Sequence, residues 1–166
     1  MTGWGNAVTT AQAPAVLLLE MGEAAGRVRV DANGLLLDIP LPAGTVGMFR
    51  SDPPRESEIE SAIDRVEEAV MPLAKVLPPG ATLVAGNALT RRVAAVAAGS
   101  DAVESVAVAA VEALFEQVAM GARRGFWSGE QRMDGSLAAG ALILREFMDH
   151  LGFDRIEVPA EADDGA

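Results

Sequence analysis

Glu20 is the first residue whose type and position could do chemistry. It follows an apolar run at residues 16–19, and the turn after it contains Gly22. A buried strand that stops at a short turn is the layout of many phosphate sites, because the backbone N–H groups of such a turn cradle phosphate. Glu23 and Ala24 stand where such a turn needs glycine. Since the Glu23 carboxylate repels phosphate, the residues predict the architecture of a phosphate loop without its chemistry.

A second turn, at Gly86 and Asn87, lies between a short apolar run and a helical pattern. The Asn87 side chain can hydrogen-bond a ligand, but asparagine at such a position is typical of a helix cap. A lone carboxylate is a poor magnesium site unless a phosphate shares the ion. Glu20 is therefore interpreted as a solvated residue at the end of a strand rather than as a metal ligand.

Phe126 and Trp127 lie in a glycine-flanked loop of a chain with only 4% aromatic residues. They are either core anchors or part of a partner surface, where tryptophan is enriched. The remaining polar groups are predicted to be structural. His150 lies near the end of the last helical pattern, where the helix dipole favours a cation, and Glu67 and Glu68 belong to a solvated helix face. We predict no catalytic residue and no metal ligand.

Hydrophobic periodicity predicts the elements that position these residues. Residues 16–19 form a continuous apolar run, typical of a strand buried on both faces. Residues 27–30 alternate between charged and apolar, and Asn33-Gly34 supplies the positive φ angles of a hairpin turn before a strand at residues 35–39. The first three strands are therefore expected to form an antiparallel meander.

Helical patterns dominate the rest of the chain. The first covers residues 54–77, with Ser51 or Asp52 as its cap and Pro72 loosening its last turn. Asp101 and Glu104 have the spacing of a capping box for a later helix. The further elements are, in order, a strand at 82–85, helices at 88–98, 101–120 and 135–151, and a strand at 155–158. This β-β-β-α-β-α-α-α-β order predicts a mixed α/β fold of the ribonuclease H-like class, with helices packed on a mixed central sheet.

Composition limits the functions open to the chain. It has 166 residues, a net charge of −11 and no cysteine, so disulfides and thiolate metal sites are excluded. The acidic charge argues against nucleic-acid binding. No apolar run reaches the roughly 18 residues of a membrane span, and the start of the chain does not resemble a signal peptide. We expect a soluble, cytoplasmic protein with one domain at residues 15–158, a flexible tail at residues 1–14 and an acidic tail at residues 159–166.

Residues 15–158 resemble the C-terminal half of the actin-like core of the exopolyphosphatase and guanosine pentaphosphate phosphohydrolase (Ppx/GppA) family. The segment at residues 20–25, Glu-Met-Gly-Glu-Ala-Ala, stands where that family has Asp-Ile-Gly-Gly-Gly followed by Ser or Thr. The resemblance continues through residues 38–49, the Ser-Asp-Pro-Pro at residues 51–54 and residues 83–90. It is most specific at residues 139–158.

This resemblance implies an actin-like lobe that would hydrolyse phosphoanhydrides with magnesium, but three departures stand against activity. Of the glycines of the phosphate loop only Gly22 is kept, since Glu23 and Ala24 replace the next two and Ala25 replaces the hydroxyl residue. The family's Gly-Gly-Thr turn is Ala-Gly-Asn at residues 85–87, so only Gly86 is kept. The first lobe, which in the family supplies a second phosphate loop and the catalytic glutamate, does not match any part of this sequence.

We therefore expect a catalytically inactive single lobe that acts as a binding or assembly module. It would act as a homodimer or with a protein that supplies the complementary lobe, without nucleic acid or membrane. Glu20, Gly22, Gly86 and Asn87 are the candidate ligand-binding residues, and Phe126 and Trp127 the candidate interface. One alternative is a phosphatase acting on polyphosphate or guanosine pentaphosphate, its site completed by a partner lobe or by dimerisation. Another is a nucleotide or phosphate sensor without turnover. No cofactor is expected, apart from magnesium if phosphate binding survives.

Overall fold

The computed structural model describes residues 14–128 and 133–160. The tails expected at the two ends of the chain lie almost wholly outside these residues. Among the described helices, none is both long enough and apolar enough to cross a bilayer.

Six strands form one mixed sheet in the order β3-β2-β1-β4-β6-β5. The first three strands pair antiparallel, which confirms the meander. β4 runs parallel to β1, β6 runs parallel to β4, and β5 is antiparallel to β6 at the edge. The strands are β1 (Val16–Glu20), β2 (Gly26–Ala32), β3 (Leu35–Leu41), β4 (Thr82–Ala85), β5 (Ser105–Ala107) and β6 (Arg155–Glu157).

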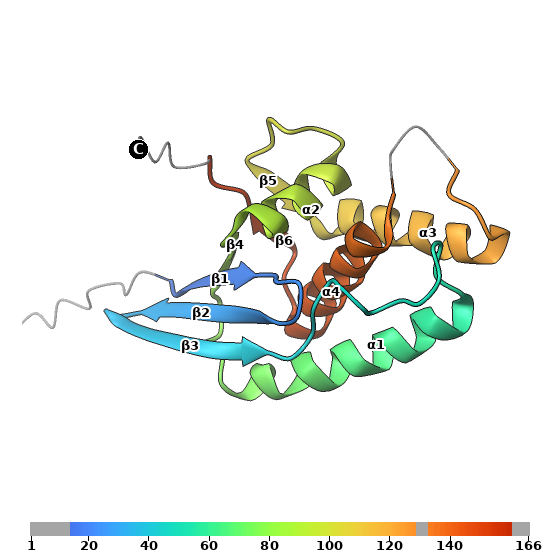
Figure 1. Ribbon diagram of the computed structural model, residues 1–166. Helices are drawn as coiled ribbons and strands as arrows, with labels where there is room; N and C mark the ends of the chain where they lie inside the picture. Colours follow the sequence, from blue (N-terminus) through green and yellow to red (C-terminus); the bar gives the residue numbers. More distant parts are fainter. Residues whose placement is uncertain (1–13, 129–132, 161–166) are drawn as a thin grey trace, which may run out of the picture.

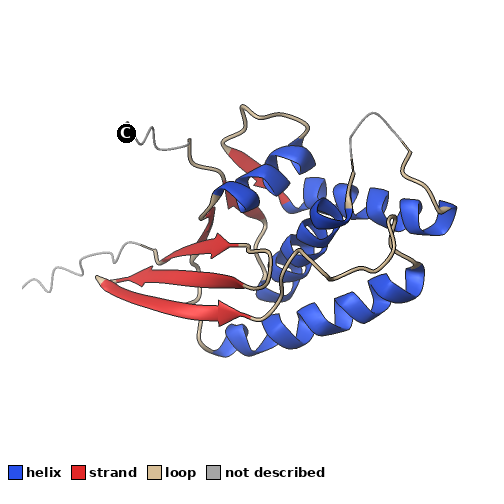
Figure 2. Ribbon diagram, in the orientation of Figure 1, coloured by secondary structure: helices blue, strands red, loops and turns tan. Residues whose placement is uncertain are grey.

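The helices pack around α4 (Gly135–Leu151), whose middle turns are buried almost all round. It contacts α1 (Glu56–Val70), α2 (Ala88–Ala98), α3 (Val108–Arg124) and the short 3₁₀ helix η1 (Met71–Lys75). The three long helices lie together on one side of the meander (Figures 1 and 2). The helix expected at residues 135–151 is confirmed, and Asp134 caps it by accepting a hydrogen bond from the Leu137 amide at 2.7 Å.

Only one face of the sheet is buried, which corrects the expectation that β1 is buried on both. Leu17 and Leu19 are inaccessible, whereas Val16 is exposed and Leu18 is half-buried. The open face carries both charged and apolar side chains, and Leu18 lies opposite Arg29 on β2. The aliphatic stem of an arginine can cover a neighbouring leucine while its charge stays in water, so a run of four apolar residues does not require a second layer of helices.

The segment before α3 is the main error in the predicted element order. Residues 105–107 form strand β5 rather than the start of a helix, and α3 begins at Val108. The expected capping box of Asp101 and Glu104 does not cap α3, because the residue before its first turn is Ala107. The Glu104 carbonyl instead accepts a hydrogen bond from the Val158 amide at 2.8 Å. Buried Val106 pairs with Ile156, so β5 depends on a partner about fifty residues away that local periodicity does not reveal.

The start of α1 also differs from expectation. Arg55 is the residue before its first turn, and Glu58 reaches back to accept from the Arg55 amide at 2.8 Å and the Arg50 amide at 2.6 Å. These backbone donors hold the pKa of Glu58 below its ordinary value. Asp52 is not the cap because its carboxylate accepts a 2.6 Å hydrogen bond from the Trp127 indole. At the other end, α1 gives way to η1 where Pro72 enters, which confirms the expected loosening.

Candidate functional site

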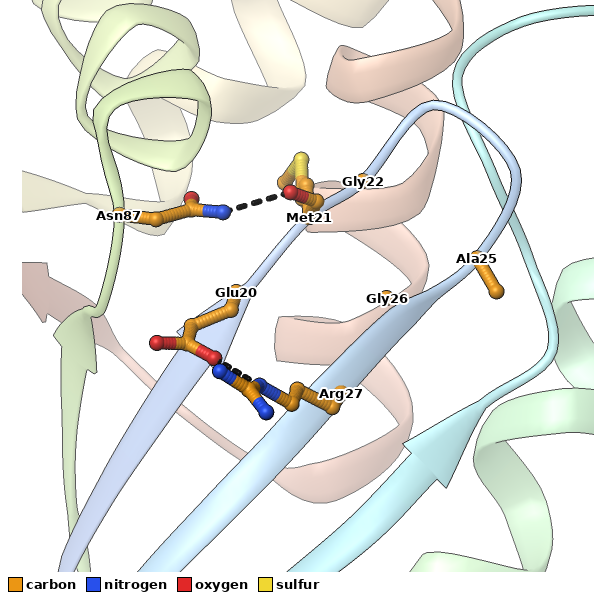
Figure 3. A pocket seen from close by; sticks show the side chains of 7 residues that line it. All are labelled: Glu20, Met21, Gly22, Ala25, Gly26, Arg27 and Asn87. Atoms are coloured by element: carbon orange, nitrogen blue, oxygen red, sulfur yellow. Dashed lines mark hydrogen bonds and ion pairs between the residues drawn. The ribbon is translucent and has the colours of Figure 1, made fainter.

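The loop between β1 and β2, residues 21–25, is fixed by hydrogen bonds to the first turn of α2. The Met21 amide donates to the buried Thr90 hydroxyl at 2.9 Å, and the Asn87 side-chain amide donates to the Met21 carbonyl at 2.6 Å. Figure 3 shows Asn87 reaching across to this carbonyl. The other side of Asn87 caps α2, since its Oδ1 accepts from both the amide and the hydroxyl of Thr90. The predicted cap is thus confirmed, and the same residue fixes the loop.

A second segment, residues 44–46, braces the loop from the opposite side. The Thr45 amide donates to the Gly22 carbonyl at 3.0 Å, and the Val46 amide donates to the Glu23 carbonyl at 2.9 Å. Gly44 packs so closely that a Cβ there would lie 2.3 Å from the Glu23 carbonyl oxygen. The loop is therefore fixed through its carbonyl groups by two separate parts of the chain.

Gly22 and Gly86 are both required by the packing of this site. A Cβ on Gly22 would lie 2.1 Å from the carbonyl oxygen of Ala25, so the tight turn excludes any side chain there. A Cβ on Gly86 would lie 2.8 Å from Cγ of Glu20. Both glycines therefore have a structural reason to be present, whether or not a ligand binds.

The Glu20 carboxylate is paired with arginines rather than free in solvent, a partnership that the sequence interpretation missed. Its side chain is 14% exposed and accepts a hydrogen bond from Arg27, directly opposite on β2 (Figure 3). Arg29 also lies 3.7 Å from it. The hydrogen bond that Arg27 donates to Glu20, together with the negative charge of that carboxylate, raises the pKa of Arg27. Arg27 also lies 3.5 Å from Asp38 on β3. Two permanent cations thus occupy the carboxylate that a metal ion would need.

Glu20, Gly22 and Asn87 line one open pocket of about 330 Å³, together with Met21, Ala25, Gly26 and Arg27. Gly86 lies directly against Glu20, so the four predicted ligand-binding residues do come together. The positive end of the α2 dipole adjoins this pocket at Asn87. Sequence reasoning missed Arg27 and Thr90. The alternation of residues 27–30 contained part of the signal for Arg27, because it places Arg27 and Arg29 on the same face of β2, but the pairing of Arg27 with Glu20 is set by the loop between β1 and β2.

Phe126 and Trp127 are not part of this pocket and differ from one another. Trp127 packs on Gly121 of α3, where an added Cβ would lie 2.5 Å from the indole ring, and its N–H donates to Asp52. It therefore anchors the loop after α3 to the segment before α1. Phe126 is exposed. Of the two predicted interface residues, Trp127 has a structural role, and Phe126 is the one left on the surface.

Comparison with known proteins places this arrangement in a fold class. No family model matches the sequence, and no curated protein matches it. Solved structures do match. The Aquifex aeolicus PPX-GPPA enzyme has a TM-score of 0.67 and 19% sequence identity, over 90% of this chain and 55% of that chain. The type II variant of the Aquifex aeolicus Ppx/GppA phosphatase gives the same TM-score and identity over 54% of its length. An exopolyphosphatase-like protein gives 0.64 and 15%, over 56% of its length.

The fold is thus the mixed α/β, actin-like fold of the Ppx/GppA structures, as the motif series predicts. The chain spans about half the length of these proteins. At this level of identity the likeness concerns the fold, and activity has to be argued from the site.

Proposed function

We propose that this chain is a catalytically inactive actin-like lobe that acts as a binding or assembly module. The observation that carries this proposal is the engagement of the Glu20 carboxylate by Arg27 and Arg29. A magnesium ion would have to displace both guanidinium groups, which stay charged at every physiological pH. Magnesium also needs several oxygen ligands or a phosphate to share, and the exposed Glu23 carboxylate repels phosphate from the loop.

The proposed assembly surface is the outer edge of β3. Leu35, Leu36 and Leu37 are all exposed there, on a seven-residue strand that pairs only with β2. Long apolar edge strands invite pairing with another strand. We assign this edge to a second copy of the chain, because two identical edges can pair antiparallel about a two-fold axis. Phe126 offers no comparable run of exposed apolar residues.

Catalysis is tested with magnesium and three substrates: inorganic polyphosphate, guanosine pentaphosphate and ATP. The proposal expects no phosphate release and no shift in unfolding temperature. A ligand present at about one hundred times its Kd stabilises the folded state by about 2.7 kcal/mol, which would be evident in a thermal scan. Turnover by the purified chain would overturn the inactive assignment and favour the phosphatase whose site is completed by a dimer.

Assembly is tested by light scattering coupled to size-exclusion chromatography. We expect a dimer that Leu36→Lys converts to a monomer, because the new charge lies on the pairing edge. Val46→Lys is the matched control, since Val46 is equally exposed but lies in the segment that braces the loop. A monomeric wild-type chain, or equal effects of the two variants, would reject the β3 edge as the contact.

A sensor of phosphate or of a nucleotide is the second candidate. It is favoured by the pocket at the α2 N-terminus, where a helix dipole and the half-exposed Arg27 meet. The thermal scan with phosphate and ATP separates the two candidates, since binding without turnover supports the sensor. Arg27→Gln should then reduce the shift, whereas Arg65→Gln, on α1 and outside this pocket, should leave it unchanged.

A further inference from the structure

Three metal-ligating side chains converge between α1 and α4, away from the loop. Glu146 and His150 lie one helical turn apart on α4, and Glu67 lies on α1. Their ligand atoms all lie within 4.8 Å of one another. α1 and α4 pack against each other along this contact (Figure 1), so the cluster joins two helices that are far apart in sequence.

The geometry centres on one nitrogen atom. His150 Nε2 lies 2.9 Å from Glu67 Oε1 and 2.9 Å from Glu146 Oε2. An imidazole nitrogen carries at most one hydrogen, so a single proton cannot make two well-aligned hydrogen bonds to these oxygens. The two carboxylates also carry the same charge. The arrangement therefore contains more acceptors than the histidine can satisfy.

Burial and a second ion pair fix the position of the Glu146 side chain. It is only 3% exposed, and its other oxygen, Oε1, accepts from Arg145 at 2.8 Å. Arg145 in turn stacks over the Phe115 ring of α3, with its guanidinium carbon 4.4 Å from the ring centre. Because Arg145 fixes Oε1, the other oxygen, Oε2, faces His150 in one orientation. Carboxylates that ligate metal ions are oriented by second partners in the same way.

We propose that Glu67, Glu146 and His150 bind a divalent transition-metal ion with the ligand preferences of zinc. Zinc lies about 2.0–2.2 Å from imidazole nitrogen and carboxylate oxygen in tetrahedral sites, which places neighbouring ligands roughly 3.3 Å apart. The two separations from His150 Nε2, 2.9 Å each, need to open only by a few tenths of an ångström, and the two carboxylate oxygens lie within 4.8 Å of each other. The ion takes the place of the shared proton and satisfies both carboxylates. Magnesium and calcium are excluded because they select oxygen ligands.

The fourth coordination position has a route to solvent. His150 lines a cavity of about 330 Å³ together with Ala74, Leu77 and Phe153. The side chains of His150 and Glu67 are 26% and 37% exposed, so a metal ion can enter without unfolding. A water molecule or a small donor ligand in the cavity completes the tetrahedron. This site is independent of the proposed function of the loop.

The chain offers an unusually clean test, because it contains one histidine and no cysteine. Zinc chloride is titrated into the untagged full-length chain and followed by calorimetry. We expect one site. His150→Gln and Glu67→Gln should each weaken binding by about tenfold to a hundredfold or abolish it. Glu68→Gln is the matched control, since Glu68 is exposed on the same helix and outside the cluster.

A second measurement keeps the proposal falsifiable if a variant folds poorly. The single imidazole gives one set of ring-nitrogen signals in NMR, so zinc should shift Nε2 of the wild-type chain far more than Nδ1. Circular dichroism checks that each variant is folded. Absence of saturable zinc binding by the wild-type chain, an unperturbed Nε2 signal, or equal affinity in Glu68→Gln and Glu67→Gln would overturn the site.

Discussion

Two clusters of carboxylates and cations in this molecule differ in their geometry. At the end of β1, one carboxylate, Glu20, meets two arginines. Between α1 and α4, two carboxylates meet the single nitrogen of His150, while the second oxygen of Glu146 is paired with Arg145. A guanidinium group offers only N–H donors and cannot ligate a metal ion, whereas an imidazole nitrogen can. The first region is therefore closed by its own side chains, and the second, open region is where we propose a metal ion.

The largest expected effect comes from the buried carboxylate of the open region. Glu146→Ala should lower the free energy of unfolding by about 3 kcal/mol, because it removes a buried carboxylate that pairs with both Arg145 and His150 and leaves the mostly buried Arg145 without that partner. Urea unfolding without metal measures this loss. The control is Glu68→Ala, because Glu68 is an exposed carboxylate on α1 outside the cluster. This variant should change the free energy of unfolding by under about 0.5 kcal/mol. If the two variants lose equal stability, Glu146 does not anchor the cluster.

The polar link beneath the closed region comes next. Asn87→Ala should lose about 2 kcal/mol, since it removes both the cap of α2 and the hydrogen bond to the Met21 carbonyl. Asn87→Asp keeps the cap oxygen and loses only the amide donor, so about half of the loss is expected. Thermal unfolding of the two variants separates the contributions. An aspartate variant as unstable as the alanine variant would place the whole effect in the link to Met21.

The ion pairs of the closed region should matter less. Glu20→Gln is expected to lower stability by under about 1 kcal/mol, because both arginines are partly exposed and surface pairs are screened. The difference from wild type should shrink further at high salt. Urea unfolding at low and high ionic strength measures both effects. A loss as large as that of Glu146→Ala would remove the distinction drawn between the two regions.

The smallest effect is a pH dependence at Glu58, whose main partners are the backbone N–H groups of Arg55 and Arg50. Backbone N–H groups lower its pKa from 4.5 in the folded state, so its ionised form stabilises the fold above that value. This contribution is lost as pH falls through the lowered folded-state pKa. Glu58→Gln should therefore be slightly less stable than wild type at neutral pH and equally stable in acid. A difference that grows on acidification would contradict this sign.

The parts of the fold that could be predicted from sequence are those set by local signals. Asn33 and Gly34 have the positive φ angles that their hairpin turn requires, and Gly99 and Gly152 end their helices in the left-handed conformation. β5 could not be found in this way, because three residues become a strand only by pairing with β6. The cap of α1 was missed for a related reason, since Asp52 is taken by Trp127 from another part of the chain.

In the candidate site, too, the features set by local sequence could be predicted and those set by distant partners could not. The order of motifs was sufficient to bring Glu20, Gly22, Gly86 and Asn87 together, because each lies at the end of a strand that the fold places next to its neighbour. The state of Glu20 was not predictable from its own segment, because its partners lie across the hairpin. The sequence interpretation treated His150 as a helix-end cation, because Glu67 is distant in sequence. The contact between the two residues is created only when α1 packs on α4.

The two edge strands of the sheet differ in length, and this difference limits how many copies of the chain can join edge to edge. β3 offers seven residues at one edge, while β5 offers only three at the other. If copies join through β3, each has used the only edge long enough to hold a partner strand, and Pro40 on that strand has no N–H to donate to a longer ladder. Association by this route would then end at two copies, because the three-residue edge at β5 is too short to pair with a further strand.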